Sequence, residues 1–105
     1  MRFLNLGKNC LDSRGVESLT NGNFKELKEL DLHDNLLDNS SIQALVKGEW
    51  KHLGVLNLNF NVVGSTGLEN MIPNKWRNLK CLSLLRNNIT NVGIVSLVKM
   101  NFPNL

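Results

Sequence analysis

The stretch LKELDLHDNLL at residues 27–37 decides how this chain folds. Its pattern, Leu-x-x-Leu-x-Leu-x-x-Asn-x-Leu, returns as LGVLNLNFNVV at residues 53–63 and as LKCLSLLRNNI at residues 79–89. Residues 1–11, MRFLNLGKNCL, fit the same pattern with Met1 in the first position. Each copy lies 26 residues after the previous one, so the 105-residue chain consists of four similar units.

Each unit has one part with the period of a strand and one part with the period of a helix. In the first part, leucines alternate with other residues, so the leucines face one side of a short strand. These pairs are Leu4/Leu6, Leu30/Leu32, Leu56/Leu58 and Leu82/Leu84. In the second part, apolar residues recur at helical spacing, which predicts helices packed behind a parallel sheet. The predicted helical stretches are residues 15–20, 41–46, 67–72 and 93–98.

Further columns of the repeat predict how the helices begin and what fills the core. One column contains only residues that cap helices well, namely Ser13, Asn39, Ser65 and Asn91. The pairs Ser40/Gln43 and Thr66/Glu69 have the spacing of a capping box, and Pro73 should end the third helix at or before the preceding residue. An aromatic column is predicted to pack in the core where each unit returns to its strand. It consists of Phe24, Trp50, Trp76 and Phe102.

The whole chain resembles the leucine-rich repeat family. The resemblance rests on the LxxLxLxxNxL pattern, the following glycine in three of the units, the helix-like stretch and the aromatic residue. It is most similar to the ribonuclease-inhibitor-like subfamily. This resemblance implies an α/β solenoid, with a concave parallel sheet of four short strands and short helices on the convex side.

The repeat also predicts how the chain is divided. The expected units are residues 1–26, 27–52, 53–78 and 79–104, which together form one leucine-rich repeat domain. Solenoids normally carry atypical terminal units that cover the last hydrophobic face, and none is recognisable here. We therefore expect a segment of a longer solenoid, or a chain whose ends another subunit covers.

One asparagine recurs in every unit, beside leucines that are predicted to be buried. A buried polar side chain costs free energy unless it is hydrogen-bonded. We therefore predict a structural ladder in which these side chains bond backbone groups of their own and the neighbouring unit, as the resemblance also implies. The predicted ladder consists of Asn9, Asn35, Asn61 and Asn87.

The sequence offers little chemistry. It has no phosphate-binding glycine loop, no GxSxG and no HExxH, so we expect no catalysis, no cofactor and no metal. The net charge of +3 gives weak attraction to nucleic acid, and no apolar run approaches the ~20 residues that cross a bilayer. Neither nucleic acid nor a membrane is the expected partner, and without a signal peptide the expected location is cytoplasmic.

The two cysteines are not expected to form a disulfide. Cys10 and Cys81 lie three units apart, about 14 Å along the stack, which is too far for a disulfide.

His33 is the strongest candidate for chemistry. It lies two residues from Asp31 on the same strand face, and Asp34 follows it. An Asp–His pair and a partial metal site are both open interpretations. No third ligand recurs in the adjacent units, so we favour an exposed polar binding surface.

The residues between the leucines form the concave face, and here the columns stop repeating. We predict that this face binds a partner through Glu29, Asp31, His33, Asp34, Val55, Asn57, Asn59, Phe60, Cys81, Ser83, Leu85 and Arg86. The last two units contribute an apolar patch beside Arg86, and exposed apolar groups flanked by charge mark protein-binding sites.

These patterns favour a non-catalytic module that binds a protein partner on its concave face. The alternative is a structural element whose open ends stack on neighbouring subunits or further repeats. A basic column precedes the strands and is either a solvated edge or a surface for an anionic partner. It contains Lys25, Lys51 and Arg77, with Lys28 and Lys80 three residues further on.

Overall fold

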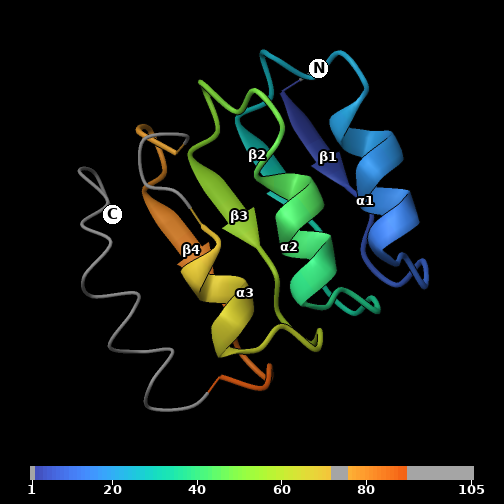
Figure 1. Ribbon diagram of the computed structural model, residues 1–105. Helices are drawn as coiled ribbons and strands as arrows, with labels where there is room; N and C mark the ends of the chain where they lie inside the picture. The colour runs from blue at the N-terminus through green and yellow to red at the C-terminus, as the bar shows by residue number, and fades with distance from the viewer. Residues whose placement is uncertain (1, 72–75, 90–105) are drawn as a thin grey trace.

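The computed structural model describes residues 2–71 and 76–89, and within them the chain forms two layers. Parallel strands lie side by side in chain order: β1 (Phe3–Asn5), β2 (Glu29–Asp31), β3 (Val55–Asn57) and β4 (Cys81–Ser83). The helices α1 (Ser13–Thr20), α2 (Asn39–Leu45) and α3 (Ser65–Glu69) alternate with the strands. All three cover the same face of the sheet (Figure 1). The predicted α/β solenoid is confirmed, and the helix predicted at residues 93–98 lies outside the described residues.

The register of the sheet follows the repeat. Leu4 pairs with Leu30, Leu30 with Leu56, and Leu56 with Leu82. Pairing in steps of one unit stacks the inward-facing leucines in rows between the sheet and the helices. The leucines of the two central strands are at most 1% exposed, namely Leu30, Leu32, Leu56 and Leu58. Because full burial of one such side chain contributes about 2 kcal/mol, these rows are a main source of stability.

The helices begin one residue earlier than the capping column predicted. Asp12 and Asp38 are the N-caps of α1 and α2, with extended backbones at φ of −121° and −120°. The predicted caps, Ser13 and Asn39, are already helical. The capping box of α2 joins Asp38 to Ser41 instead of Ser40 to Gln43. The prediction was wrong because Asp, Ser and Asn all cap well, so residue type alone does not choose between adjacent positions.

The third helix is capped from its neighbour. Its N-cap, Gly64, has no side chain to accept a hydrogen bond. Asn39, at the start of α2, supplies the acceptor: its Oδ1 receives the N–H groups of Gly64 and Gly67 at 2.8 and 2.9 Å. A Cβ on Gly67 would lie 2.5 Å from this oxygen, so the close approach requires glycine. The starts of α2 and α3 are thus fastened together.

The aromatic column lies in the core, as predicted, where it is described. Trp50 and Trp76 are 3% and 0% exposed, and their rings stack with centroids 6.3 Å apart and 7° between planes. Trp50 Nε1 donates to the Leu45 carbonyl at 2.7 Å, whereas Trp76 Nε1 finds no partner among the described residues. Phe24 packs half-buried against this core, and Phe102 lies outside the described residues. The stacked indoles join the second unit to the third.

Candidate functional site

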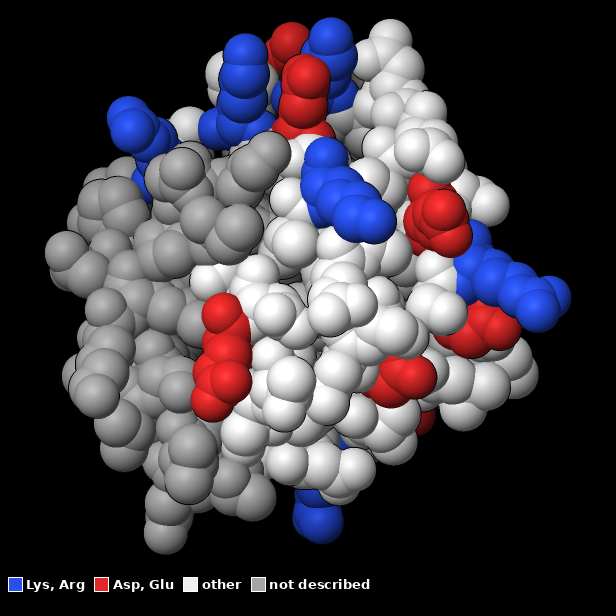
Figure 2. Space-filling view, viewed as in Figure 1, with Lys and Arg blue, Asp and Glu red and all other residues white. Residues whose placement is uncertain are grey.

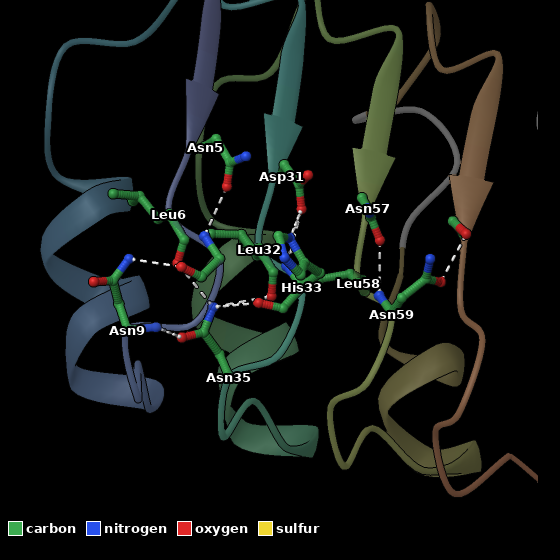
Figure 3. A network of polar contacts seen from close by, with 12 residues as sticks. Asn5, Leu6, Asn9, Asp31, Leu32, His33, Asn35, Asn57, Leu58 and Asn59 are labelled. Carbon is green, nitrogen blue, oxygen red and sulfur yellow. Dashed lines mark hydrogen bonds and ion pairs between the residues drawn. The ribbon is translucent and has the colours of Figure 1, made fainter.

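The recurring asparagine that follows β2, Asn35, bridges the first two units (Figure 3). Asn35 Nδ2 donates to the carbonyls of Leu6 and Leu32, both at 3.0 Å, and its Oδ1 accepts the N–H groups of Asn9 and Leu11. Its carboxamide therefore satisfies backbone groups of its own unit and of the preceding one.

The same arrangement recurs in the next two units. Asn61 Nδ2 donates to the Leu32 carbonyl at 2.9 Å and its Oδ1 accepts from Leu37. Asn87 donates to the Leu58 carbonyl at 2.8 Å and accepts from Val63. Asn35 and Asn61 are only 7% and 5% exposed, so their role is internal. Asn9 is exposed, and among the described residues its Nδ2 donates only to the carbonyl of Gly7.

A second row of polar side chains ends the strands on the concave face. Asn5, Asp31 and Asn57 each accept the backbone N–H of the residue two positions later, at 2.8 to 3.0 Å. Ser83 occupies this column in the fourth unit. In that unit the acceptor for the N–H two positions later comes from Asn59 of the third unit. Its Oδ1 accepts both the Leu85 N–H and the Ser83 hydroxyl at 2.7 Å. Four predicted contact residues, Asp31, Asn57, Asn59 and Ser83, therefore hold the concave face in shape.

His33 pairs with Asp31 on this face. Its Nδ1 lies 2.6 Å from Asp31 Oδ1, and both side chains are about one third exposed or less. The imidazole lies over Gly7 of the preceding unit, where a Cβ would be 2.1 Å from the ring. In the described part of the chain, no three His, Cys, Asp or Glu side chains come together as metal ligands. Of the two open interpretations, the geometry favours the Asp–His pair.

The residue before each ladder asparagine has a left-handed backbone. Lys8, Asp34, Phe60 and Arg86 have φ between 52° and 58°. This conformation costs a non-glycine residue roughly 1–2 kcal/mol, and hydrogen bonds between units offset the cost. Asp34 N–H donates to the Asn59 carbonyl at 2.9 Å, and Phe60 N–H to the Leu85 carbonyl at 2.8 Å. The rim of the concave face is thus a fixed frame for exposed side chains.

Several exposed apolar side chains gather on and beside this frame. Leu85 is 59% exposed and Phe60 46%, as the predicted patch requires, while Val55 is half-buried. The structure adds Leu36 at 58% and Val62 at 48%, which sequence reasoning missed. Their loops are adjacent, since Val62 N–H donates to the Leu37 carbonyl at 2.8 Å. The signal was available: the variable position after the ladder asparagine is apolar in two units. We call Leu36, Phe60, Val62 and Leu85 the apolar rim.

The other predicted contact residues are accessible. Glu29, Asp34, Cys81 and Arg86 are exposed, and both Cys10 and Cys81 are free thiols. Glu29 and Cys81 begin their strands, while Asp34 and Arg86 lie at the opposite rim.

Comparison with known proteins agrees with this architecture. The sequence profile of the family described as Leucine Rich repeat matches residues 1–19, 51–71 and 77–98, together more than half of the chain. The chain belongs to the leucine-rich repeat family. A search of curated proteins returned no match. Leucine-rich repeats generally mediate protein–protein interaction and are typically not catalytic.

The leucine-rich repeat chain also has a basic edge where its strands begin. Figure 2 shows Lys and Arg side chains gathered along the edge from which the strands of Figure 1 start, with acidic side chains among them. In the predicted basic column, Lys25 is paired, with its Nζ 3.6 Å from Glu49 Oε2. Within the described residues, no helix is long and apolar enough to cross a bilayer.

Proposed function

We propose that this leucine-rich repeat chain binds a protein partner through the apolar rim and the adjoining concave face, without catalysis. The observation that carries the proposal is the exposure of four large apolar side chains on neighbouring loops, in a frame fixed by backbone hydrogen bonds between units. Exposed apolar side chains that are rimmed by charge mark interaction sites. Arg86 and Asp34 provide that charge in the same column as Phe60.

Site-specific photo-crosslinking tests the proposal. A benzophenone amino acid replaces Leu85 on the apolar rim or, as a matched control, exposed Gln43 on α2. In extract from the source cells, the rim position should capture a protein that the α2 position does not. Phe60→Ala and Arg86→Glu should each weaken binding of that protein by about tenfold, as for interface anchors, and leave the melting temperature unchanged. Equal capture from both positions, or full affinity in both variants, would contradict rim binding.

A second candidate function, assembly through the open edge of β1, is favoured by Asn9. The Oδ1 of Asn35 receives two N–H groups from the preceding unit, but the same atom of Asn9 receives none from the described residues. Beside it, Phe3 is 65% exposed and Leu4 and Leu6 are only half-buried. We propose that another leucine-rich repeat unit, from a longer chain or another subunit, stacks on this edge, next to the first of the four proposed units.

Light scattering over a concentration series tests stacking between copies of this chain. The mass should rise with concentration, and Phe3→Lys should suppress the rise by placing a charge on the edge strand. Phe60→Ala, at the apolar rim, is the control and should leave the association unchanged. A monomer at every concentration would contradict stacking between copies.

We also propose that the repeat units are of the ribonuclease-inhibitor-like type, because a helix follows each of the first three strands.

A further inference from the structure

A depression of about 430 Å³ lies where β2, β3 and β4 begin, at the opposite ends of the strands from the apolar rim. Its walls carry Lys28, His52 and Lys80, and Gly54 lies between the two lysines along the sheet. Asn78, Glu29 and Val55 complete the lining. We call this depression the basic notch.

Gly54 opens the notch, and neither packing nor backbone geometry requires glycine there. Arg2, Lys28 and Lys80 occupy the same column in the other units. A Cβ on Gly54 would lie 3.6 Å from the Asn78 carbonyl and 3.8 Å from the Lys28 carbonyl, which are ordinary contacts, and its φ is not positive. A larger residue would therefore fit. Because Gly54 has no side chain, it leaves a gap in a column that is otherwise basic.

The floor of the notch is held by the sheet. Gly54 N–H donates to the Lys28 carbonyl at 2.8 Å, and the Gly54 carbonyl accepts from Lys80 and Cys81 at 2.8 and 3.0 Å. The backbones of Lys28 and Lys80 are two strands apart, about 10 Å. The two lysine side chains thus start from a rigid base at which the separation of their backbones is fixed.

The charges of the notch are largely uncompensated. Lys28, His52 and Lys80 are exposed and form no ion pair within the described part of the chain, in contrast to Lys25, which meets Glu49. Glu29 is the single acidic residue of the lining. Two lysines against one carboxylate give a site that attracts negative charge.

We propose that the basic notch binds an acidic segment of the protein partner, with carboxylate side chains placed against Lys28 and Lys80. The inference rests on the proposed function only in taking the partner to be a protein. Alternate side chains of an extended peptide are about 7 Å apart, which suits two flexible lysines about 10 Å apart at their backbones. The Gly54 N–H is already bonded within the sheet and is not free to cradle a phosphate.

An NMR titration of the 105-residue chain with acetylated hexaglutamate at low salt tests the proposal. The amide signals of Gly54, Val55 and Cys81 should shift and saturate, and the shifts should fade at high salt as charges are screened. Lys28→Glu combined with Lys80→Glu should weaken binding by about tenfold. Lys47, an exposed lysine just beyond α2, does not line the notch. Lys47→Glu reverses one charge where the double variant reverses two, and it should change affinity less than about twofold.

Two further variants separate a shaped site from general attraction. Gly54→Leu fills the notch without altering charge and should weaken binding, whereas Glu29→Gln should strengthen it. Absence of binding, or equal weakening by Lys47→Glu, would overturn the proposal. So would saturation of the same amides by inorganic phosphate or a single-stranded RNA oligonucleotide at the same concentration. Crosslinking from Leu85 does not depend on these lysines, so failure here and failure of rim binding are distinguishable.

Discussion

At the scale of single residues, the asparagines of one column differ in whether their side chains join two units. Asn35, Asn61 and Asn87 each join two units through their carboxamides, whereas the hydrogen bonds of Asn9 to other units use only its backbone. The difference does not come from residue type, because all four are identical. It comes from the neighbour that each side chain meets, and only Asn9 has no preceding unit among the described residues.

Replacing Asn61 with alanine should therefore cost much more stability than replacing Asn9. Asn61→Ala leaves the buried Leu37 N–H without its acceptor, and it removes one of the two side-chain donors to the Leu32 and Leu58 carbonyls, which Asn35 and Asn87 still reach. We expect a loss of roughly 1–3 kcal/mol in the free energy of unfolding, against about 0.5 kcal/mol or less for Asn9→Ala. Denaturant unfolding measures both, and similar losses in the two variants would contradict a ladder between units.

The concave face shows where residue-level prediction from sequence stops. Period-2 alternation identifies which side chains leave the core, and Leu85 is exposed accordingly. Phe60 has the parity of the buried Leu58 and is exposed at a left-handed residue beyond the strand, where the alternation has ended. It does not identify which of those side chains are engaged locally. Asp31 and Asn57 look available for binding in sequence, yet both accept backbone N–H groups two residues away. Such bonds depend on the turn conformation after the strand, which the repeat pattern does not encode.

At the scale of elements, helix starts are stabilised both within a unit and between units. Asp38 and Ser41 form a reciprocal box within α2, while Asn39 reaches across to α3. The sequence predicted the region that caps the helices, but it did not predict which residue caps its own helix and which caps the next one. The cross-unit cap exists only because Gly64 lacks a side chain and Gly67 leaves room.

Asn39→Ala should loosen α3 more than the helix that contains Asn39. Loss of this acceptor should cost about 1 kcal/mol, and amide exchange at Gly64 and Gly67 should accelerate. The Ser41 amide, which bonds to Asp38, should stay protected. Asp38→Ala is the matched control and should reverse this pattern. Faster exchange at Ser41 than at Gly67 in Asn39→Ala would contradict the assignment.

The cap of α2 should also depend on pH. The Ser40 hydroxyl donates to Asp38 at 2.7 Å and, with the backbone and hydroxyl of Ser41, lowers the pKa of that carboxyl against the opposing effect of desolvation. A lowered pKa in the folded state adds stability above the ordinary carboxyl pKa of about 3.9. That stability is lost as pH falls through the lower, folded-state value. The stability advantage over Asp38→Asn should therefore shrink below about pH 4, and an unchanged difference from pH 7 to pH 2 would contradict it.

At the scale of the whole molecule, the fold follows from repetition. A column of leucines at fixed spacing specifies the strand, its register and its buried face at once, because each unit completes its core only against the next. Leu30 pairs with Leu4 and Leu56 for this reason. The proposed partner surface is not repeated, and so the repeat that predicts the scaffold does not predict the notch at Gly54.

Within the helix layer and within the sheet, each described element neighbours only the matching element of an adjacent unit, so damage at one end should stay local. Leu4→Ala, at a half-buried position of the first unit, should speed amide exchange in β1 while leaving the stacked pair of Trp50 and Trp76 intact. Leu56→Ala, at a fully buried position of the third unit, should lower the free energy of unfolding by roughly 2–5 kcal/mol. The circular dichroism signal of the indoles should then be lost at a lower denaturant concentration than in the unchanged protein. Near-ultraviolet circular dichroism follows the indoles, and hydrogen exchange follows β1. Equal shifts of the indole transition in both variants would mean that the described units unfold as one block, with no role for nearest-neighbour contacts.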